Sequence, residues 1–62
     1  MPAEREILFE FHRVGGSIKV TAVDVESLTE VSIVGPPHAG EAELRRIAIA
    51  KLDYVQTKKR RS

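Results

Sequence analysis

The sequence predicts an α+β fold with two layers, in which a three-stranded antiparallel β-meander is packed on one face by a C-terminal α-helix (βββα). Three observations predict it. Apolar residues alternate with polar ones in three short segments, glycine and proline separate these segments, and the last third has apolar residues three and four positions apart. The chain has 62 residues and no cysteine, so we expect one domain, over residues 1–57, held by apolar packing without disulfides. Residues 58–62 are expected to form a disordered basic tail.

The first two predicted strands cover residues 7–14 and 18–24, which read ILFEFHRV and IKVTAVD. Gly15–Gly16 lies between them. Two adjacent glycines tolerate the positive φ angles of a type I′ turn, which joins two strands through two residues. The pattern therefore predicts a β-hairpin.

The two-residue turn determines the register of this hairpin. It sets Phe11 opposite Val20 and Phe9 opposite Ala22, and residues paired in this way share one face of a sheet. The apolar residues of both strands then fall on the same face, and a shift of one residue would destroy this agreement. We expect Phe9 and Phe11 to anchor the core on that face.

A third predicted strand covers residues 30–34, which read EVSIV, after a loop at residues 25–28. This spacing sets Val31 opposite Ala22, again one apolar residue against another. The second strand is therefore expected to be the central one.

Gly35–Pro37 ends the predicted sheet, and an amphipathic helix is predicted from about Ala39. The residue that caps its N-terminus is either His38 or Gly40. The apolar stripe of the helix should lie across the face that carries the two phenylalanines. The stripe consists of Leu44, Ile47, Ala48, Leu52 and Val55.

The sequence has no pattern typical of a catalytic, cofactor-binding or metal-binding site. The glycines of Gly35–Gly40 have the spacing of a phosphate-binding loop, but Glu41–Ala42 stands where that loop requires Lys and Ser or Thr. His12 and His38 are far apart in the predicted topology, and a metal needs about three or four ligands. Glu10 and His12 share an open sheet face rather than a pocket. We expect no enzymatic activity, no cofactor and no metal.

The outer face of the sheet, which the helix leaves uncovered, should carry more aliphatic side chains than a small monomer needs. This outer face and the two edge strands lead to the main functional hypothesis. The protein is expected to be a non-enzymatic module that binds another protein or itself, as a homodimer for example, through this face or an edge strand. The candidate interaction residues are Leu8, His12, Val14, Val23, Val34 and, on the helix outside its apolar stripe, Ile49.

A basic cluster near the C-terminus supports an alternative function, nucleic-acid binding. Residues 1–57 carry six basic and nine acidic side chains, whereas the cluster consists of Lys58, Lys59, Arg60 and Arg61. These side chains could contact phosphates, but such a cluster is more often a solvated helix end. The chain has one tyrosine and two phenylalanines, too few for a base-stacking surface.

No apolar run approaches the roughly 20 residues of a membrane span, and the first residues lack the basic and apolar regions of a signal peptide. We therefore expect a cytoplasmic protein that makes no contact with membranes.

Five segments carry a resemblance to a known family: LFEFH at residues 8–12, IKVTAVD at 18–24, TEVSIVGP at 29–36, AGE at 39–41 and KLDYV at 51–55. Through them the chain resembles a family of short, uncharacterised alphaproteobacterial proteins that are grouped as a domain of unknown function. TEVSIVGP is the most specific of these segments. The resemblance implies a bacterial cytosolic protein, and it supplies no activity and no site residue.

Overall fold

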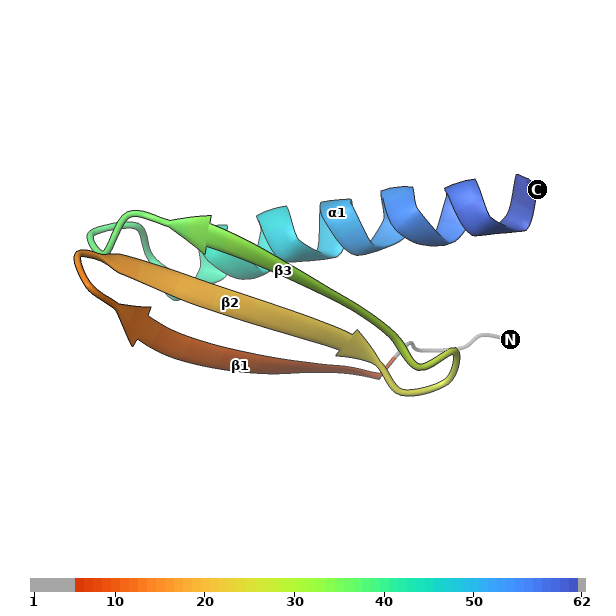
Figure 1. Cartoon of the computed structure of the whole chain (residues 1–62), viewed down its shortest axis with the longest axis horizontal. Helices are drawn as coiled ribbons and strands as arrows, with labels where there is room; N and C mark the ends of the chain where they lie inside the picture. The colour runs from red at the N-terminus through yellow and green to blue at the C-terminus, as the bar shows by residue number, and fades with distance from the viewer. Residues whose placement is uncertain (1–5, 62) are drawn as a thin grey trace.

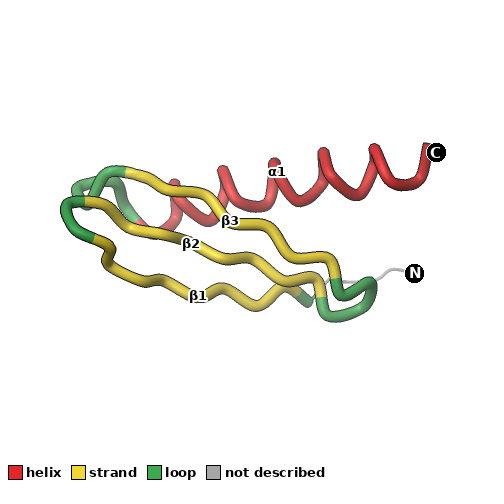
Figure 2. Tube along the Cα trace, in the orientation of Figure 1, coloured by secondary structure: helices red, strands yellow, loops and turns green. Residues whose placement is uncertain are grey.

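The computed structural model describes the backbone of residues 6–61 and the side chains of residues 6–58. Three antiparallel strands form one sheet in the order β1-β2-β3, and one helix packs against it (Figures 1 and 2). This arrangement confirms the predicted α+β fold and the central place of the second strand. The elements are β1 (Ile7–Val14), β2 (Ser17–Asp24), β3 (Thr29–Gly35) and α1 (Glu41–Arg61).

The hairpin of β1 and β2 has the predicted register, with Phe11 opposite Val20 and Phe9 opposite Ala22. The turn type differs from the prediction. Only Gly15 has a positive φ, at 60°, and Gly16 does not. A positive φ at the first central residue alone is typical of a type II′ turn, whereas a type I′ turn needs it at both. The conformational freedom of glycine is therefore needed at Gly15 and not at Gly16.

The connection between β2 and β3 has the predicted length and register, with Val31 opposite Ala22. The turn closes through a hydrogen bond of 2.7 Å from the backbone N–H of Leu28 to the carbonyl oxygen of Asp24. Leu28 adopts a φ of 59° and is 78% exposed. Non-glycine residues rarely adopt this left-handed conformation, so the turn holds Leu28 in an unfavourable geometry.

The junction between the sheet and α1 depends on two glycines. A Cβ atom at Gly35 would lie 2.5 Å from Cδ2 of the buried Leu44, so a larger residue there would force the Leu44 side chain to shift. Gly40 precedes the helix, and its carbonyl oxygen accepts a hydrogen bond of 3.1 Å from the N–H of Leu44. Gly40, rather than His38, is therefore the N-cap residue.

The core lies between α1 and the two strands β2 and β3, because the helix is displaced towards β3 (Figure 1). Phe9 and Phe11 pack against the edge of this core and are only half-buried. The prediction that both rings face the helix is confirmed, but they lie at the margin of the core, since the helix does not extend over β1 far enough to bury them. The buried apolar residues are Val20, Ala22, Val31, Leu44, Ala48 and Leu52.

The buried stripe of α1 is rotated slightly from the predicted one. Ile47 was expected in the stripe and is 41% exposed, whereas Ile49 was expected outside it and is half-buried. Within the described residues, no helix has an apolar stretch of the length needed to cross a membrane. The helix backbone continues through residues 58–61, where the sequence predicts a tail.

Candidate functional site

The two edges of the sheet differ in how their backbone groups are used. In an antiparallel pair, hydrogen-bonded residues alternate with residues whose N–H and C=O groups point away from the partner strand. The N–H of Val25 donates to the carbonyl oxygen of Glu6 at 3.3 Å, which sets this alternation for β1. The residues of β1 that bond to β2 are therefore Leu8, Glu10, His12 and Val14.

The remaining residues of β1 direct their backbone N–H and C=O groups outward, and we call this row the β1 edge. It consists of Ile7, Phe9, Phe11 and Arg13. Within residues 6–61, the strand order places no neighbour beside β1 on this side. An edge of this kind is a template for pairing with a further strand.

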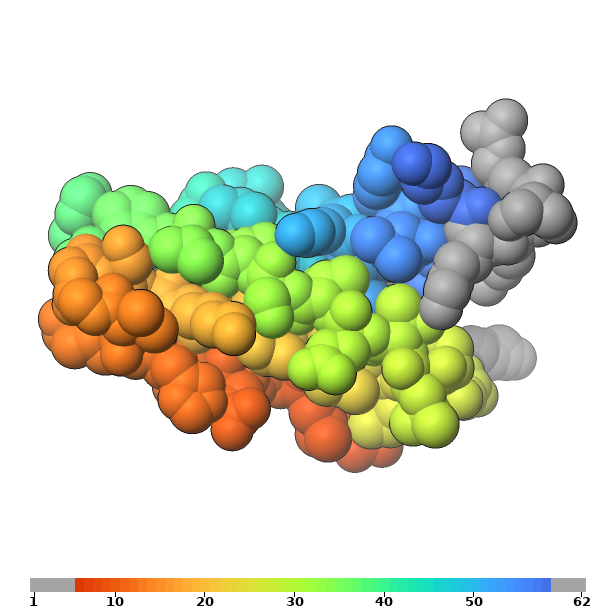
Figure 3. All heavy atoms as spheres, viewed as in Figure 1, coloured from red at the N-terminus to blue at the C-terminus, as the bar shows by residue number. Residues whose placement is uncertain are grey.

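The opposite edge, on β3, is occupied at its middle by a side chain of α1. The same alternation carried across β2 directs the backbone groups of Ser32 away from the sheet. Nζ of Lys51, on α1, donates a hydrogen bond of 2.9 Å to the carbonyl oxygen of Ser32. The helix and Lys51 therefore oppose strand addition at β3, while β1 lies on the side of the molecule away from α1 (Figure 3).

Two residues of the β1 edge, Phe9 and Phe11, place aromatic rings on the inner face of the sheet. Cζ of Arg45, on α1, lies 5.8 Å from the ring centroid of Phe9 and 6.0 Å from that of Phe11. These distances are within the range of a cation–π contact. Both rings also pack against the core cluster and remain only half-buried. The β1 edge thus combines outward backbone groups with partly uncovered aromatic rings.

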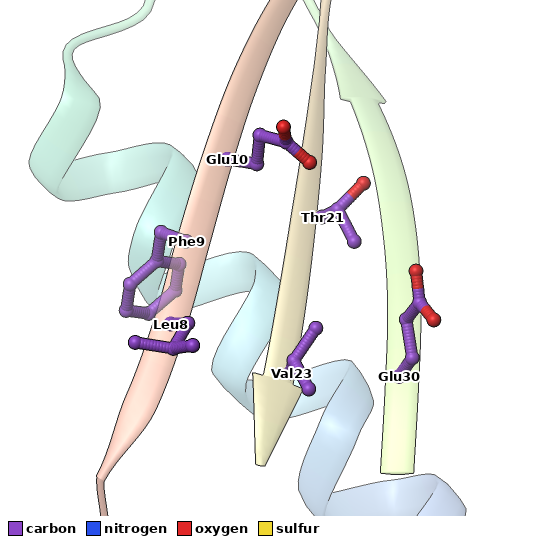
Figure 4. Close-up of a pocket in the computed structure, with 6 residues that line it drawn as sticks. All are labelled: Leu8, Phe9, Glu10, Thr21, Val23 and Glu30. Atoms are coloured by element: carbon purple, nitrogen blue, oxygen red, sulfur yellow. The ribbon is translucent and has the colours of Figure 1, made fainter. Parts of the chain in front are cut away.

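The outer face of the sheet holds most of the predicted interaction residues, but it separates them. Leu8 is directly opposite Val23, and these two line a shallow depression of about 400 Å³ (Figure 4). Val34 lies nearer the other end of the sheet, opposite Lys19. The remaining residues that line the depression are Phe9, Glu10, Thr21 and Glu30.

Polar residues cross the middle of this outer face from strand to strand. Glu10 is opposite Thr21, and the hydroxyl oxygens of Thr21 and Ser32 are 3.1 Å apart. Val14 and Val34 are therefore not continuous with the aliphatic pair of the depression. Ile49 lies on α1, behind the sheet. The structure does not bring the six predicted interaction residues together into one surface.

Glu10 and His12 form the polar pair that the sequence predicts. Nε2 of His12 lies 3.2 Å from Oε2 of Glu10, and the two side chains are 55% and 69% exposed. Acid–base catalysis requires a site that positions a substrate and shifts the pKa of the catalytic group. A pair this open to solvent has the geometry of a surface contact between polar side chains.

No group of three or more His, Asp and Glu side chains that could hold a metal ion occurs in the described part of the chain. His38 lies in the turn before α1, where the N–H of Ala39 donates to the carbonyl oxygen of Pro36 at 3.1 Å. On the solvent-facing side of the helix, Glu43 raises the pKa of Arg46 through a hydrogen bond of 2.7 Å and its negative charge.

The basic cluster is described only in part. Nζ of Lys58 lies 5.6 Å from the ring centroid of Tyr54, a cation–π contact on the exposed side of α1. The side chains of Lys59, Arg60 and Arg61 lie outside the described residues.

A polar cluster around the buried Asp24, which the sequence does not reveal, ties α1 to the turn after β2. Asp24 is 5% exposed, and its Oδ1 accepts hydrogen bonds from the backbone N–H groups of Glu26 and Ser27. Nε2 of Gln56 donates to Oδ2 of Asp24 at 2.9 Å and to Oγ of Ser27 at 2.8 Å. Asp24 ends the second predicted strand and Ser27 lies in the predicted loop, but no local pattern connects them with Gln56.

Comparison with known proteins gives one result. A comparison with curated proteins gave no match, and a comparison with solved structures gave none. A family model described as Domain of unknown function (DUF6898) matches residues 4–60, which include all three strands and almost all of the helix. The chain therefore belongs to the family of that domain of unknown function.

Proposed function

We propose that the protein is a non-enzymatic interaction module that binds a polypeptide by adding it as a further strand at the β1 edge. The asymmetry between the two sheet edges carries this proposal. Lys51 donates a hydrogen bond to an outward carbonyl oxygen of β3. On β1, the outward carbonyl groups of Phe9, Phe11 and Arg13 lie on the side away from the helix. Strand addition of this kind derives affinity from backbone hydrogen bonds and specificity from the adjacent side chains.

The β1 edge is a better candidate than the outer face that the sequence also proposed. The outer-face aliphatic residues are divided by a polar row that includes Glu10 and Thr21, so they offer no continuous apolar patch. At the β1 edge, Phe9 and Phe11 lie beside each other on the inner face and are half-exposed. An added strand would cover these rings while its backbone pairs with β1.

A proline substitution at Arg13 tests the proposal. The N–H of Arg13 points outward, so Arg13→Pro removes a group that an added strand needs without removing a hydrogen bond to β2. Arg13→Ala is the matched control, because it removes the same side chain and keeps the N–H. Both variants and the original protein are immobilised and exposed to an extract of the cells that produce the protein.

We expect partners captured by the original protein and by Arg13→Ala to be lost with Arg13→Pro, while circular dichroism shows the same fold for all three. Partners that persist with Arg13→Pro and disappear with Val23→Asp, on the outer face, would contradict the β1 edge and favour the other surface.

The alternative function, nucleic-acid binding, has less support from the described side chains. The charged groups on the outer face include Glu10 and Glu30 as well as Lys19, rather than the row of basic residues that nucleic-acid readers present. The alternative would therefore depend on the basic cluster at residues 58–61 alone.

A further inference from the structure

We infer that the strand bound at the β1 edge is β1 of a second copy of this chain, paired antiparallel with Phe11 opposite the partner's Phe11. This inference rests on the proposed function of β1 as a strand-binding edge and names its partner. It would produce a symmetric dimer with one continuous sheet, β3-β2-β1-β1-β2-β3, and both helices on the same face.

The alternation along β1 restricts how two copies can pair. Antiparallel strands related by a two-fold axis pair residues whose numbers add to a constant. Outward groups must meet outward groups, so odd-numbered residues pair with odd-numbered residues and even with even. Only a few registers satisfy this condition and still overlap most of β1.

Charge complementarity distinguishes these registers. With Phe11 on the axis, Glu10 lies opposite the partner's His12, and Leu8 lies opposite the partner's Val14. A shift that puts Glu10 on the axis would place two carboxylates directly opposite each other, and like charges in that position destabilise a sheet. A shift in the other direction would place two copies of His12 opposite each other. The Phe11-centred register has the most favourable pairs.

The inner face of β1 fits the same register. Phe11 would lie beside the partner's Phe11, and Phe9 would lie opposite the partner's Arg13, an aromatic ring against a cation. The backbones of three such pairs would exchange about six hydrogen bonds. The half-exposed rings of each chain would then be covered by the other copy, as the displacement of α1 towards β3 permits.

Cysteine pairing between two exposed positions tests the register, because the chain has no cysteine of its own. Glu10→Cys and His12→Cys are made separately and mixed in a glutathione redox buffer. In the proposed register, these positions are about 4.5 Å apart between Cα atoms, a distance that a disulfide can bridge. The control mixture pairs Glu10→Cys with Lys19→Cys, an exposed position on β2 that the dimer does not bring to the axis.

Intact-mass spectrometry is expected to show mainly the mixed disulfide for the first pair and a statistical mixture for the control. A statistical mixture for both pairs, or an excess of Glu10→Cys homodimer or His12→Cys homodimer, would overturn the proposed register.

Sedimentation equilibrium of the purified protein tests the dimer itself. We expect a mass approaching twice the 6.9 kDa of one chain, and a return to 6.9 kDa with Arg13→Pro. A monomer at high micromolar concentration would overturn self-pairing. The proposed function would still stand if Arg13→Pro abolishes the capture of another protein. Both proposals fail if Arg13→Pro changes neither the captured partners nor the mass from sedimentation.

Discussion

Gly15 and Gly16 occupy one turn, yet only Gly15 has a backbone conformation that other residues avoid. We expect Gly15→Ala to lower the free energy of unfolding by about 1–2 kcal/mol, because an alanine must adopt the left-handed conformation there. Gly16→Ala should raise it by about 0.4–1 kcal/mol, since no atom lies within 4 Å of its added Cβ and the unfolded chain loses freedom. Urea unfolding of both variants measures the difference. An equal decrease in the free energy of unfolding for the two variants would instead indicate the type I′ turn that the sequence predicts.

Two glycines in sequence could not by themselves distinguish these turn types, because type I′ and type II′ both accept glycine at the first central position. The same limit applies to Leu28, where no local signal in the sequence predicts a positive φ. Residue types define which conformations are allowed, and the closure of the surrounding strands selects among them.

The contact between α1 and the β2–β3 turn depends on one buried carboxylate. Asp24→Ala would remove the acceptor for the backbone N–H groups of Glu26 and Ser27, and it would remove one of the two acceptors of Gln56. We expect a loss of about 2–4 kcal/mol in the free energy of unfolding. Glu30→Ala, at an exposed acidic residue on the neighbouring strand, is the matched control and should stay within about 0.5 kcal/mol of the original protein. Similar losses in both variants would show that the buried cluster adds no specific stability.

At the scale of elements, the strands and their registers were predictable from the sequence. The alternation of apolar residues and the loop lengths are local features, and together they permit one pairing that puts Phe9, Phe11, Val20 and Ala22 on the same face. The lateral position of α1 was not predictable. The spacing of its apolar residues shows which side of the helix is buried, but this spacing does not indicate which strands that side covers.

That lateral position also decided how much of the candidate site could be predicted. The sequence identified an edge strand as one of two interaction surfaces, and it could not choose between them. The choice depends on contacts between residues far apart in the chain, such as Lys51 with Ser32 and Arg45 with Phe9. The period of the strands identifies the aliphatic residues of the outer face, and most of the predicted interaction residues are therefore there rather than at the half-buried rings of β1.

For the whole molecule, the small core lies under α1, and β1 contributes only to its margin. A chain of this length has a total stability of roughly 3–9 kcal/mol. Leu52 is fully buried, so Leu52→Ala should cost about 2–5 kcal/mol and unfold a large fraction of the molecules. Phe11 is half-buried, so Phe11→Ala should cost less than Leu52→Ala in dilute solution, about 1–2 kcal/mol.

Protein concentration separates these two variants further. A partner that binds only the folded chain stabilises it by mass action, so a self-pairing protein becomes more stable as its concentration rises. Because Phe11 lies at the centre of the proposed dimer, Phe11→Ala should weaken this dependence, whereas Leu52→Ala should retain it with a lower midpoint. Thermal unfolding at 5 µM and at 500 µM, about a hundredfold range, measures both effects. If Phe11→Ala is the more damaging variant at the lower concentration, the aromatic side chains carry the core of the monomer after all, and their exposure at the β1 edge can no longer support a docking surface.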